Sequence, residues 1–170
     1  MPSQQEFSTN KEQSVIKCES VYKIFGDNAK KMLQGSLGNV DAKTFQDEGC
    51  IVGVNNASFE VSEGELLVVM GLSGSGKSTL LRCISRLTDA TAGKIYIDGE
   101  DLLAMSGKEL IELRRNKMGM VFQSFALLPH KTVLENIAFP LQVKGNTTKE
   151  SIKRAKDMVD LVGLDGRENY

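Results

Sequence analysis

The chain has no long apolar run, no excess of charge of one sign and no cysteine-rich segment, and each absence excludes a class of protein. The longest apolar run, Leu66 to Met70, is far shorter than the roughly 18 residues that a membrane-spanning helix needs. The 21 Lys and Arg nearly balance the 22 Asp and Glu, which argues against nucleic acid or anionic lipid as the main partner. The three cysteines are far apart in the sequence, which predicts reduced thiols rather than a disulfide framework or a zinc site.

What remains is an ordinary globular composition, 41% hydrophobic and 25% charged, over 170 residues, enough for one domain. The polar residues 1–14 predict a flexible tail and lack the apolar core of a secretory signal. Residues 15–25 and 52–61 have the β-branched and aromatic content that is typical of strands. The intervening residues 27–50 are too many for a hairpin loop, so they predict an insertion of one or two short helices.

Two apolar segments predict further strands. Leu66–Met70 is the kind of strand that is buried on both faces of a parallel sheet, and Lys117–Gln123 predicts another apolar strand. Helix starts are marked where a hydroxyl residue is followed three positions later by Glu, at Ser106, Thr132 and Thr147. This alternation of strands and helices predicts an α/β fold.

The strongest signal is GLSGSGKST, which fits the phosphate-loop pattern G-x-x-x-x-G-K-[ST]. Glycines let successive backbone N–H groups turn toward phosphate oxygens, and the helix expected to begin near Lys77 adds the positive end of its dipole. Lys77 would reach the β- and γ-phosphates, and the Ser78 hydroxyl would ligate Mg²⁺. The pattern predicts that a nucleoside triphosphate is bound by Gly71, Leu72, Ser73, Gly74, Ser75, Gly76, Lys77, Ser78 and Thr79.

Three kinds of phosphate-loop protein compete at this point: a transport ATPase subunit, a GTPase and a small-molecule or nucleotide kinase. Residues 116–119 come close to the guanine-reading N-K-x-D but lack its Asp, and the D-x-x-G of residues 160–163 falls in a helical pattern. A kinase would usually supply an Arg-rich lid, for which only Arg114 and Arg115 are available. The dinucleotide fingerprint G-x-G-x-x-G fails because Thr79 stands where its third Gly belongs.

The order of motifs after residue 14 resembles the ATP-binding subunit of ABC transporters along nearly the whole chain. KIFG is similar to the segment whose aromatic ring stacks on adenine, with Phe25 as the match and Tyr22 as the fallback. The sequence of residues 91–102 resembles the β-hairpin after the phosphate-loop helix, and that of residues 120–139 resembles the glutamine loop. The resemblance implies an α/β P-loop NTPase fold of the ABC type, incomplete, with a β-subdomain and the start of a helical subdomain.

The resemblance also implies boundaries and roles. The ATP-binding domain would run over residues 15–170, with the glutamine loop and helical subdomain from about residue 124. Gln123 would contact Mg²⁺ and the attacking water. Lys77 and Gln123 are therefore the catalytic candidates, and Ser78 and Gln123 are the candidate metal ligands.

The helical insertion, the loop text GLSGSGKST and the text VFQSFALLPH together resemble the importer group for glycine betaine, proline and related quaternary amines. The implied protein is a transport-coupled ATPase at the cytoplasmic side of the cell membrane that uses ATP and Mg²⁺. Its partners would be transmembrane permease subunits, a second copy of itself and, indirectly, a solute-binding protein, with no nucleic acid. Two alternatives stay open, an importer for another small polar solute and a non-hydrolysing ATP-binding fragment.

In the family the pattern continues with an LSGGQ signature, a strand ending in Asp-Glu and a γ-phosphate-sensing His, and none of these occurs up to Tyr170. This chain alone is therefore expected to bind ATP weakly and not to hydrolyse it. Among the carboxylates, Asp98 before Gly99 predicts a hairpin turn and Glu135 a helix cap, so neither is favoured as the catalytic base. The single histidine, His130, is expected to have a structural or partner-contact role.

Overall fold

The computed structural model describes residues 14–124 and 126–170. The tail predicted for residues 1–14 lies outside the described residues except for Ser14, which begins the first strand instead of ending a tail. The chain divides into two units, the first ending at Leu110 and the second beginning at Ile111.

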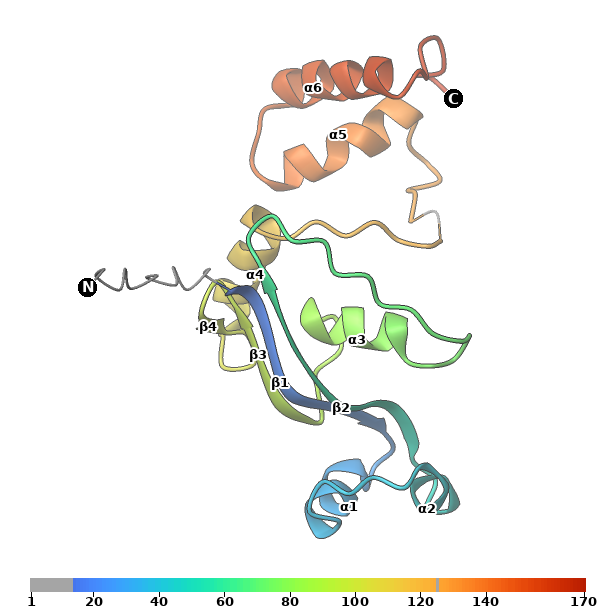
Figure 1. Cartoon of the computed structure of the whole chain (residues 1–170). Helices are drawn as coiled ribbons and strands as arrows, with labels where there is room; N and C mark the ends of the chain where they lie inside the picture. The colour runs from blue at the N-terminus through green and yellow to red at the C-terminus, as the bar shows by residue number, and fades with distance from the viewer. Residues whose placement is uncertain (1–13, 125) are drawn as a thin grey trace, which may run out of the picture. The chain divides into compact units, whose positions relative to one another are not determined.

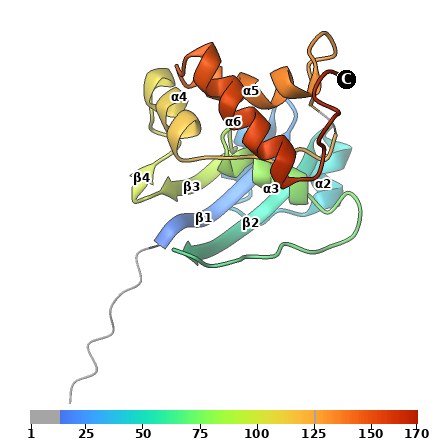
Figure 2. The same cartoon turned by 90° about the horizontal axis from the view of Figure 1, so that it is seen from above.

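The first unit is built on an antiparallel four-stranded sheet in the order β2-β1-β3-β4 (Figures 1 and 2). β1 (Ser14–Phe25) and β2 (Ile51–Ser62) pair along nearly their whole length, and β3 (Ala92–Ile97) pairs with the other edge of β1. The strands that the sequence predicts at residues 15–25 and 52–61 are therefore confirmed.

β3 and β4 (Glu100–Asp101) form a tight hairpin. Its two turn residues, Asp98 and Gly99, have φ angles of +49° and +81°. Positive φ at both central positions is the geometry of a type I′ turn, whose twist matches that of the flanking strands. The prediction that Asp98 belongs to a turn is confirmed.

Two short helices, α1 (Ala29–Gly35) and α2 (Ala42–Asp47), lie between β1 and β2 at one end of the sheet (Figure 1). Asp41 caps α2 by accepting a hydrogen bond from the Thr44 N–H at 2.9 Å. This insertion has its own apolar core, in which the helices pack against the end of the β1–β2 pair. The buried members of the cluster are Ile24, Ala29, Leu33, Phe45 and Cys50.

α3 (Lys77–Ile84) follows the glycine-rich loop and contacts β1 and β2. It buries Leu80 and Cys83, while the sheet contributes further fully buried side chains such as Val21 and Ile95. Burial of these apolar side chains holds the helix on the sheet, so the start of the helix has a defined position beside β2.

The two apolar segments predicted as strands, residues 66–70 and 117–123, are not strands. Each of the five residues from Leu66 to Met70 is between 40% and 86% exposed. The sheet of the described residues has four strands, and neither segment pairs with any of them. Apolar content favours a strand only where a neighbouring strand accepts and donates its backbone hydrogen bonds. The expected parallel sheet is likewise wrong for the described residues, whose strand pairs are all antiparallel.

The second unit consists mainly of two contacting helices, α5 (Val133–Val143) and α6 (Thr148–Leu161), and α4 (Gly107–Asn116) spans the boundary between the units. Complete capping boxes are present at Thr132 and Thr147, as the sequence predicts. The third is present too, because residues 106 and 109 exchange backbone-to-side-chain hydrogen bonds. Across the described ranges, no helix combines the length and the apolar character needed to cross a bilayer.

Candidate nucleotide-binding site

The loop before α3 contains two glycines in conformations that other residues rarely adopt. Gly74 has a φ of +80° and Gly76 a φ of +89°, both in the left-handed region. Gly76 carries a second constraint, because a Cβ on this residue would overlap the carbonyl oxygen of Gly53 in β2. The loop therefore curls closely against the sheet just before the helix begins at Lys77.

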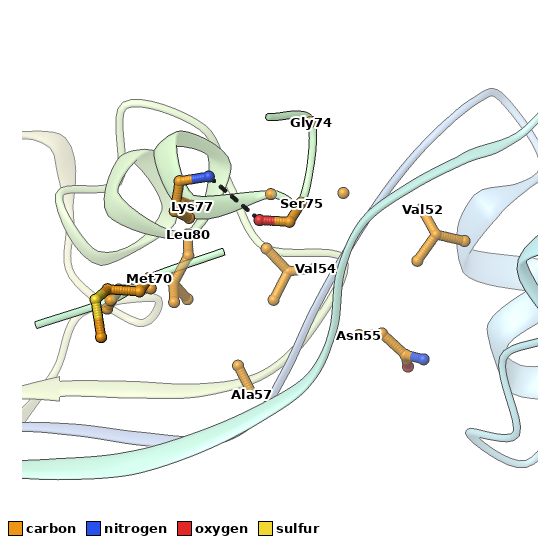
Figure 3. A pocket seen from close by; sticks show the side chains of 12 residues that line it. Val52, Val54, Asn55, Ala57, Met70, Gly74, Ser75, Lys77 and Leu80 are labelled. Atoms are coloured by element: carbon orange, nitrogen blue, oxygen red, sulfur yellow. Dashed lines mark hydrogen bonds between the residues drawn. The ribbon is translucent and has the colours of Figure 1, made fainter. Parts of the chain in front are cut away.

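The side chain of Lys77 folds back onto this loop. Its Nζ donates hydrogen bonds to the carbonyl oxygens of Gly71 at 2.8 Å and Leu72 at 2.6 Å. A third and longer bond, 3.3 Å, reaches Ser75 Oγ (Figure 3). Charged phosphate oxygens are stronger acceptors for an ammonium group than neutral oxygens are. Lys77 can therefore exchange these bonds for contacts to a phosphate bound at the loop.

The first turn of α3 adds backbone N–H groups and two hydroxyl side chains. Its N-cap is Gly76, and no side chain among the described residues caps it. The first N–H groups of a helix lack partners within the helix and, with the helix dipole, attract anions. Ser78 and Thr79 lie in this turn and line a cavity of about 240 Å³ together with Lys77. The turn offers the donors that a triphosphate needs.

Phe25 lines the same cavity and so lies beside the loop. Phe25 ends β1, is 43% exposed, and lines the cavity with Lys77 and Ser78. The backbone just before it is fixed by Thr91, whose hydroxyl accepts from the Ile24 N–H at 2.9 Å and donates to the Ile24 carbonyl at 3.1 Å. An exposed aromatic ring beside a phosphate site can stack on the base of a bound nucleotide.

Tyr22, the fallback for the stacking role, lies elsewhere in the first unit. Its hydroxyl donates to the carbonyl of Gly38 at 3.3 Å, and its ring packs against the buried cluster of the insertion. It lines a different cavity, with Leu33 and Ala92. The structure thus brings Phe25 and not Tyr22 to the loop, while the stacking itself stays a prediction.

A second cavity, of about 380 Å³, also borders the loop. Its walls are mostly apolar side chains from β2, α3 and the segment before the loop, among them Val54, Leu80 and Met70 (Figure 3). Among the described side chains that line it, Lys77 is the only charged one, Asn55 adds an amide and Ser75 a hydroxyl. The smaller cavity, with its two hydroxyls and its aromatic ring, is the better match to a nucleotide.

Three other candidates belong to the second unit and are not among the residues that line this cavity: Gln123, His130 and Glu135. Gln123 is exposed in the second unit, in a segment without regular structure, and its catalytic and metal-binding roles stay predictions. Glu135 accepts from the Thr132 N–H at 2.9 Å, and this bond holds the pKa of its carboxyl below the ordinary value. Glu135 therefore caps a helix, as the sequence predicts. His130 is an exposed turn residue.

Two residues next to the site were not predicted from the sequence. Gly53 interrupts a strand pattern, and a glycine inside such a pattern signals a bulge or a close backbone approach, so this signal was available. Thr91 binds the backbone of Ile24, which is 67 positions away in the sequence. No local pattern marks a contact of that kind.

A glycine-rich loop that enters a helix at Lys-Ser, seated against a sheet, defines a phosphate-loop domain. Comparison with known proteins agrees with this class. The family model described as ABC transporter matches residues 54–169. The chain belongs to the ABC transporter family.

Two curated relatives illustrate the similarity. The trimethylamine N-oxide transport system ATP-binding protein TmoW of Pelagibacter ubique (strain HTCC1062) is 83% identical over 156 residues, 92% of this chain and 46% of the relative. The glycine betaine transport ATP-binding protein OpuAA of Bacillus subtilis (strain 168) is 49% identical over 155 residues, 91% of this chain and 37% of the relative. The chain therefore spans less than half the length of these relatives.

Among solved structures, the dimeric post-hydrolysis state of the ATP-binding cassette MJ0796 bound to ADP and Pi matches with a TM-score of 0.72 at 32% identity. The match covers 91% of this chain and 60% of that one. The α/β P-loop fold of the ABC type, predicted as incomplete, is confirmed by this likeness together with the family match.

Proposed function

We propose that the chain binds ATP, with the triphosphate at the loop of residues 71–79 and the adenine against Phe25. The observation that carries the proposal is the single cavity lined by Phe25, Lys77, Ser78 and Thr79. Lys77 neutralises the β- and γ-phosphates, the amides of the loop and of the first turn of α3 donate to their oxygens, and the ring provides a surface for the base. Stacking accepts any purine, so the preference for ATP over GTP is modest.

Mg²⁺ fits this site as a companion of the nucleotide rather than as a resident metal. Over residues 14–124 and 126–170, no three His, Cys, Asp or Glu side chains gather to hold a metal ion. The hydroxyl of Ser78, exposed at the cavity, is a suitable oxygen ligand, and Gln123 is the second candidate. When bound, Mg²⁺ would neutralise charge on the β- and γ-phosphates.

In the whole protein, the proposed role is that of a transport-coupled ATPase, the ATP-binding subunit of an importer for a small methylated amine. The name of the 83% identical relative favours trimethylamine N-oxide, and that of the 49% identical relative supports glycine betaine as the next choice. Proline and other small polar solutes remain alternatives. The proposal puts the subunit at the cytoplasmic face of the membrane, with permease subunits and a second copy as direct partners and a solute-binding protein as an indirect one.

The phosphate site is tested by Lys77→Ala. Removing the ammonium group should abolish measurable ATP binding by titration calorimetry, because a charge-assisted contact contributes roughly 3 kcal/mol. The fold should persist, since within the described part of the chain the Lys77 side chain donates hydrogen bonds only to the loop. Lys43→Ala, which removes an exposed lysine from α2, is the matched control. Unchanged affinity in a folded Lys77→Ala variant would contradict the proposed site.

Phosphate release separates the ATPase from the second candidate, a non-hydrolysing ATP-binding fragment. The assay uses the 170-residue chain with ATP and Mg²⁺, beside the Lys77→Ala variant. We expect the two to release phosphate equally slowly, since neither Asp98 nor Glu135 is free to act as a base: one forms a hairpin turn and the other a helix cap. Turnover well above the variant would mean that another group in the chain supplies the base.

A further inference from the structure

Gly53 stands at an irregularity in the pairing of β1 with β2. Lys23 pairs with Val54, but the next residue of β1, Ile24, pairs with Val52. Gly53 is therefore the extra residue of a β-bulge. Because paired residues share a face, the bulge puts Val52 and Val54 on opposite faces, and Figure 3 shows Val54 toward Leu80 with Val52 turned away. Lys23 pairs with Val54, so Lys23 and Phe25, two positions apart in β1, both lie on the face that carries α3.

The space around Gly53 is too tight for a Cβ unless its neighbours shift. A Cβ built on it would lie 2.9 Å from Phe25 Cε2, 3.0 Å from Thr79 Cγ2 and 3.3 Å from the carbonyl oxygen of Lys23. The φ of Gly53 is outside the left-handed region, so its backbone is open to any residue and the demand for glycine comes from space alone. Its own carbonyl oxygen lies against Gly76 of the loop. Gly53 thus touches both halves of the proposed nucleotide site.

Lys23 also contacts the Phe25 ring. Lys23 Nζ lies 4.8 Å from the ring centroid, a cation–π contact. Lys23 is absent from the lining of the nucleotide cavity, whereas Phe25 and Gly53 are part of it. The Lys23 ammonium group therefore lies over the ring, and the Gly53 backbone lies beside its Cε2 atom. The ring also lines the cavity.

We propose that Gly53 is a positioning residue for base recognition: because it has no side chain, the Phe25 ring can lie close to the first turn of α3, where Lys23 also contacts it. Since Phe25, Lys77 and Ser78 line one cavity, a base stacked on Phe25 and a triphosphate at the loop can belong to one nucleotide. A larger residue at position 53 moves the ring relative to the loop, so the base and the triphosphate no longer fit together. The inference rests on the proposed stacking of adenine on Phe25.

The test is a double-mutant cycle between Gly53→Ala and Phe25→Ala in the full 170-residue chain. Affinities for ATP and for inorganic triphosphate, which has no base, are measured by calorimetry. Gly53→Ala should weaken ATP binding about five- to tenfold, a part of what base–aromatic stacking contributes, and leave triphosphate binding within about twofold. In the Phe25→Ala background, Gly53→Ala should have no further effect on ATP.

Gly35→Ala is the matched control, because Gly35 is in the same unit, has no positive φ and has nothing within 4 Å of its added Cβ. Equal losses for ATP and triphosphate, or full additivity with Phe25→Ala, would overturn the inference by showing that Gly53 serves the loop or the fold. If the wild-type chain binds no ATP, the proposed function fails instead, which is a separate outcome.

A second variant keeps the inference testable if Gly53→Ala does not fold. Lys23→Met keeps the aliphatic stem but removes the cation from the ring. It should weaken ATP binding about threefold, with no further effect in the Phe25→Ala background. A Lys23→Met variant that binds ATP like the wild type, or that loses the same affinity when Phe25 is absent, would contradict the positioning of the ring.

Discussion

The helices α3 and α5 differ in how their N-termini are capped. α3 starts after Gly76, which has no side chain to offer. α5 starts after Thr132, whose hydroxyl accepts from the Glu135 N–H at 3.2 Å while the Glu135 carboxylate accepts from the Thr132 N–H at 2.9 Å. One helix end is left open and the other is closed by its own sequence.

Backbone from the end of the chain completes the closure of α5. The Val133 N–H donates to the carbonyl of Tyr170 at 2.9 Å, and the Leu134 N–H donates to that of Glu168 at 3.0 Å. The first N–H groups of any helix need acceptors. At α5 the protein supplies them, whereas at α3 the glycine cap leaves them to a ligand. A helix N-terminus can therefore bind an anion only where the chain does not cap it.

Among changes at these two helix ends, the largest effect is expected from Gly76→Ala, which disturbs the open end. The methyl group would overlap the Gly53 carbonyl, and a non-glycine residue at a φ of +89° is strained by roughly 1–2 kcal/mol. The loop must therefore leave its place against β2, and ATP binding should fall at least about a hundredfold by calorimetry. Gly99→Ala is the control, since Gly99 has a similarly positive φ, +81°, but an open surrounding. If both variants bind ATP equally well, the open helix end is not the phosphate site.

A smaller effect is expected from Ser78→Ala, which removes the candidate metal ligand but leaves the backbone donors of α3 in place. In the presence of Mg²⁺, ATP should bind about tenfold more weakly, because a hydrogen-bonding group that faces a charged partner contributes about 1.5 kcal/mol. Without Mg²⁺ the affinity should barely change. Equal losses in titrations with Mg²⁺ and with a chelator would contradict the ligand role and leave the N–H groups as the main contribution of this turn.

Opening the closed end should affect stability instead of binding. Thr132→Ala removes the cap of α5 and should lower the free energy of unfolding by about 1 kcal/mol in a denaturant titration. Thr147→Ala, at the matching capping box of α6, should cost a similar amount. Both variants should bind ATP like the wild type. A change in ATP affinity with Thr132→Ala would show that the two helix ends are not independent.

The smallest effect concerns pH. The Thr132 N–H stabilises the charged form of Glu135 and lowers the pKa of its carboxyl from the ordinary 4.5. A lowered folded-state pKa adds stability that is complete above the unfolded value and is lost as the pH falls through the folded one. Stability should therefore decline below about pH 4.5, and Glu135→Gln should flatten that part of the curve. If the free energy of unfolding of Glu135→Gln falls at acid pH as it does in the wild type, the decline is due to other carboxylates, such as Glu109 and Glu150.

Features whose causes lie within a few residues could be predicted from the sequence. The phosphate loop, the capping boxes at Thr132 and Thr147, and the turn at Asp98-Gly99 all follow from side chains and backbone preferences that act between near neighbours along the chain. Such signals can be read directly, because the same short segment contains both the residue and its partner.

Features that need a partner from far along the chain became visible in the folded structure. It brought Phe25 and not Tyr22 to the loop, made Gly53 a bulge against Gly76, and left residues 66–70 without a neighbouring strand. An aromatic ring, a glycine or an apolar segment has the same local character wherever it lies. Its role is fixed by what packs against it, and in a sheet the hydrogen-bonding partner of one strand is another segment of the chain.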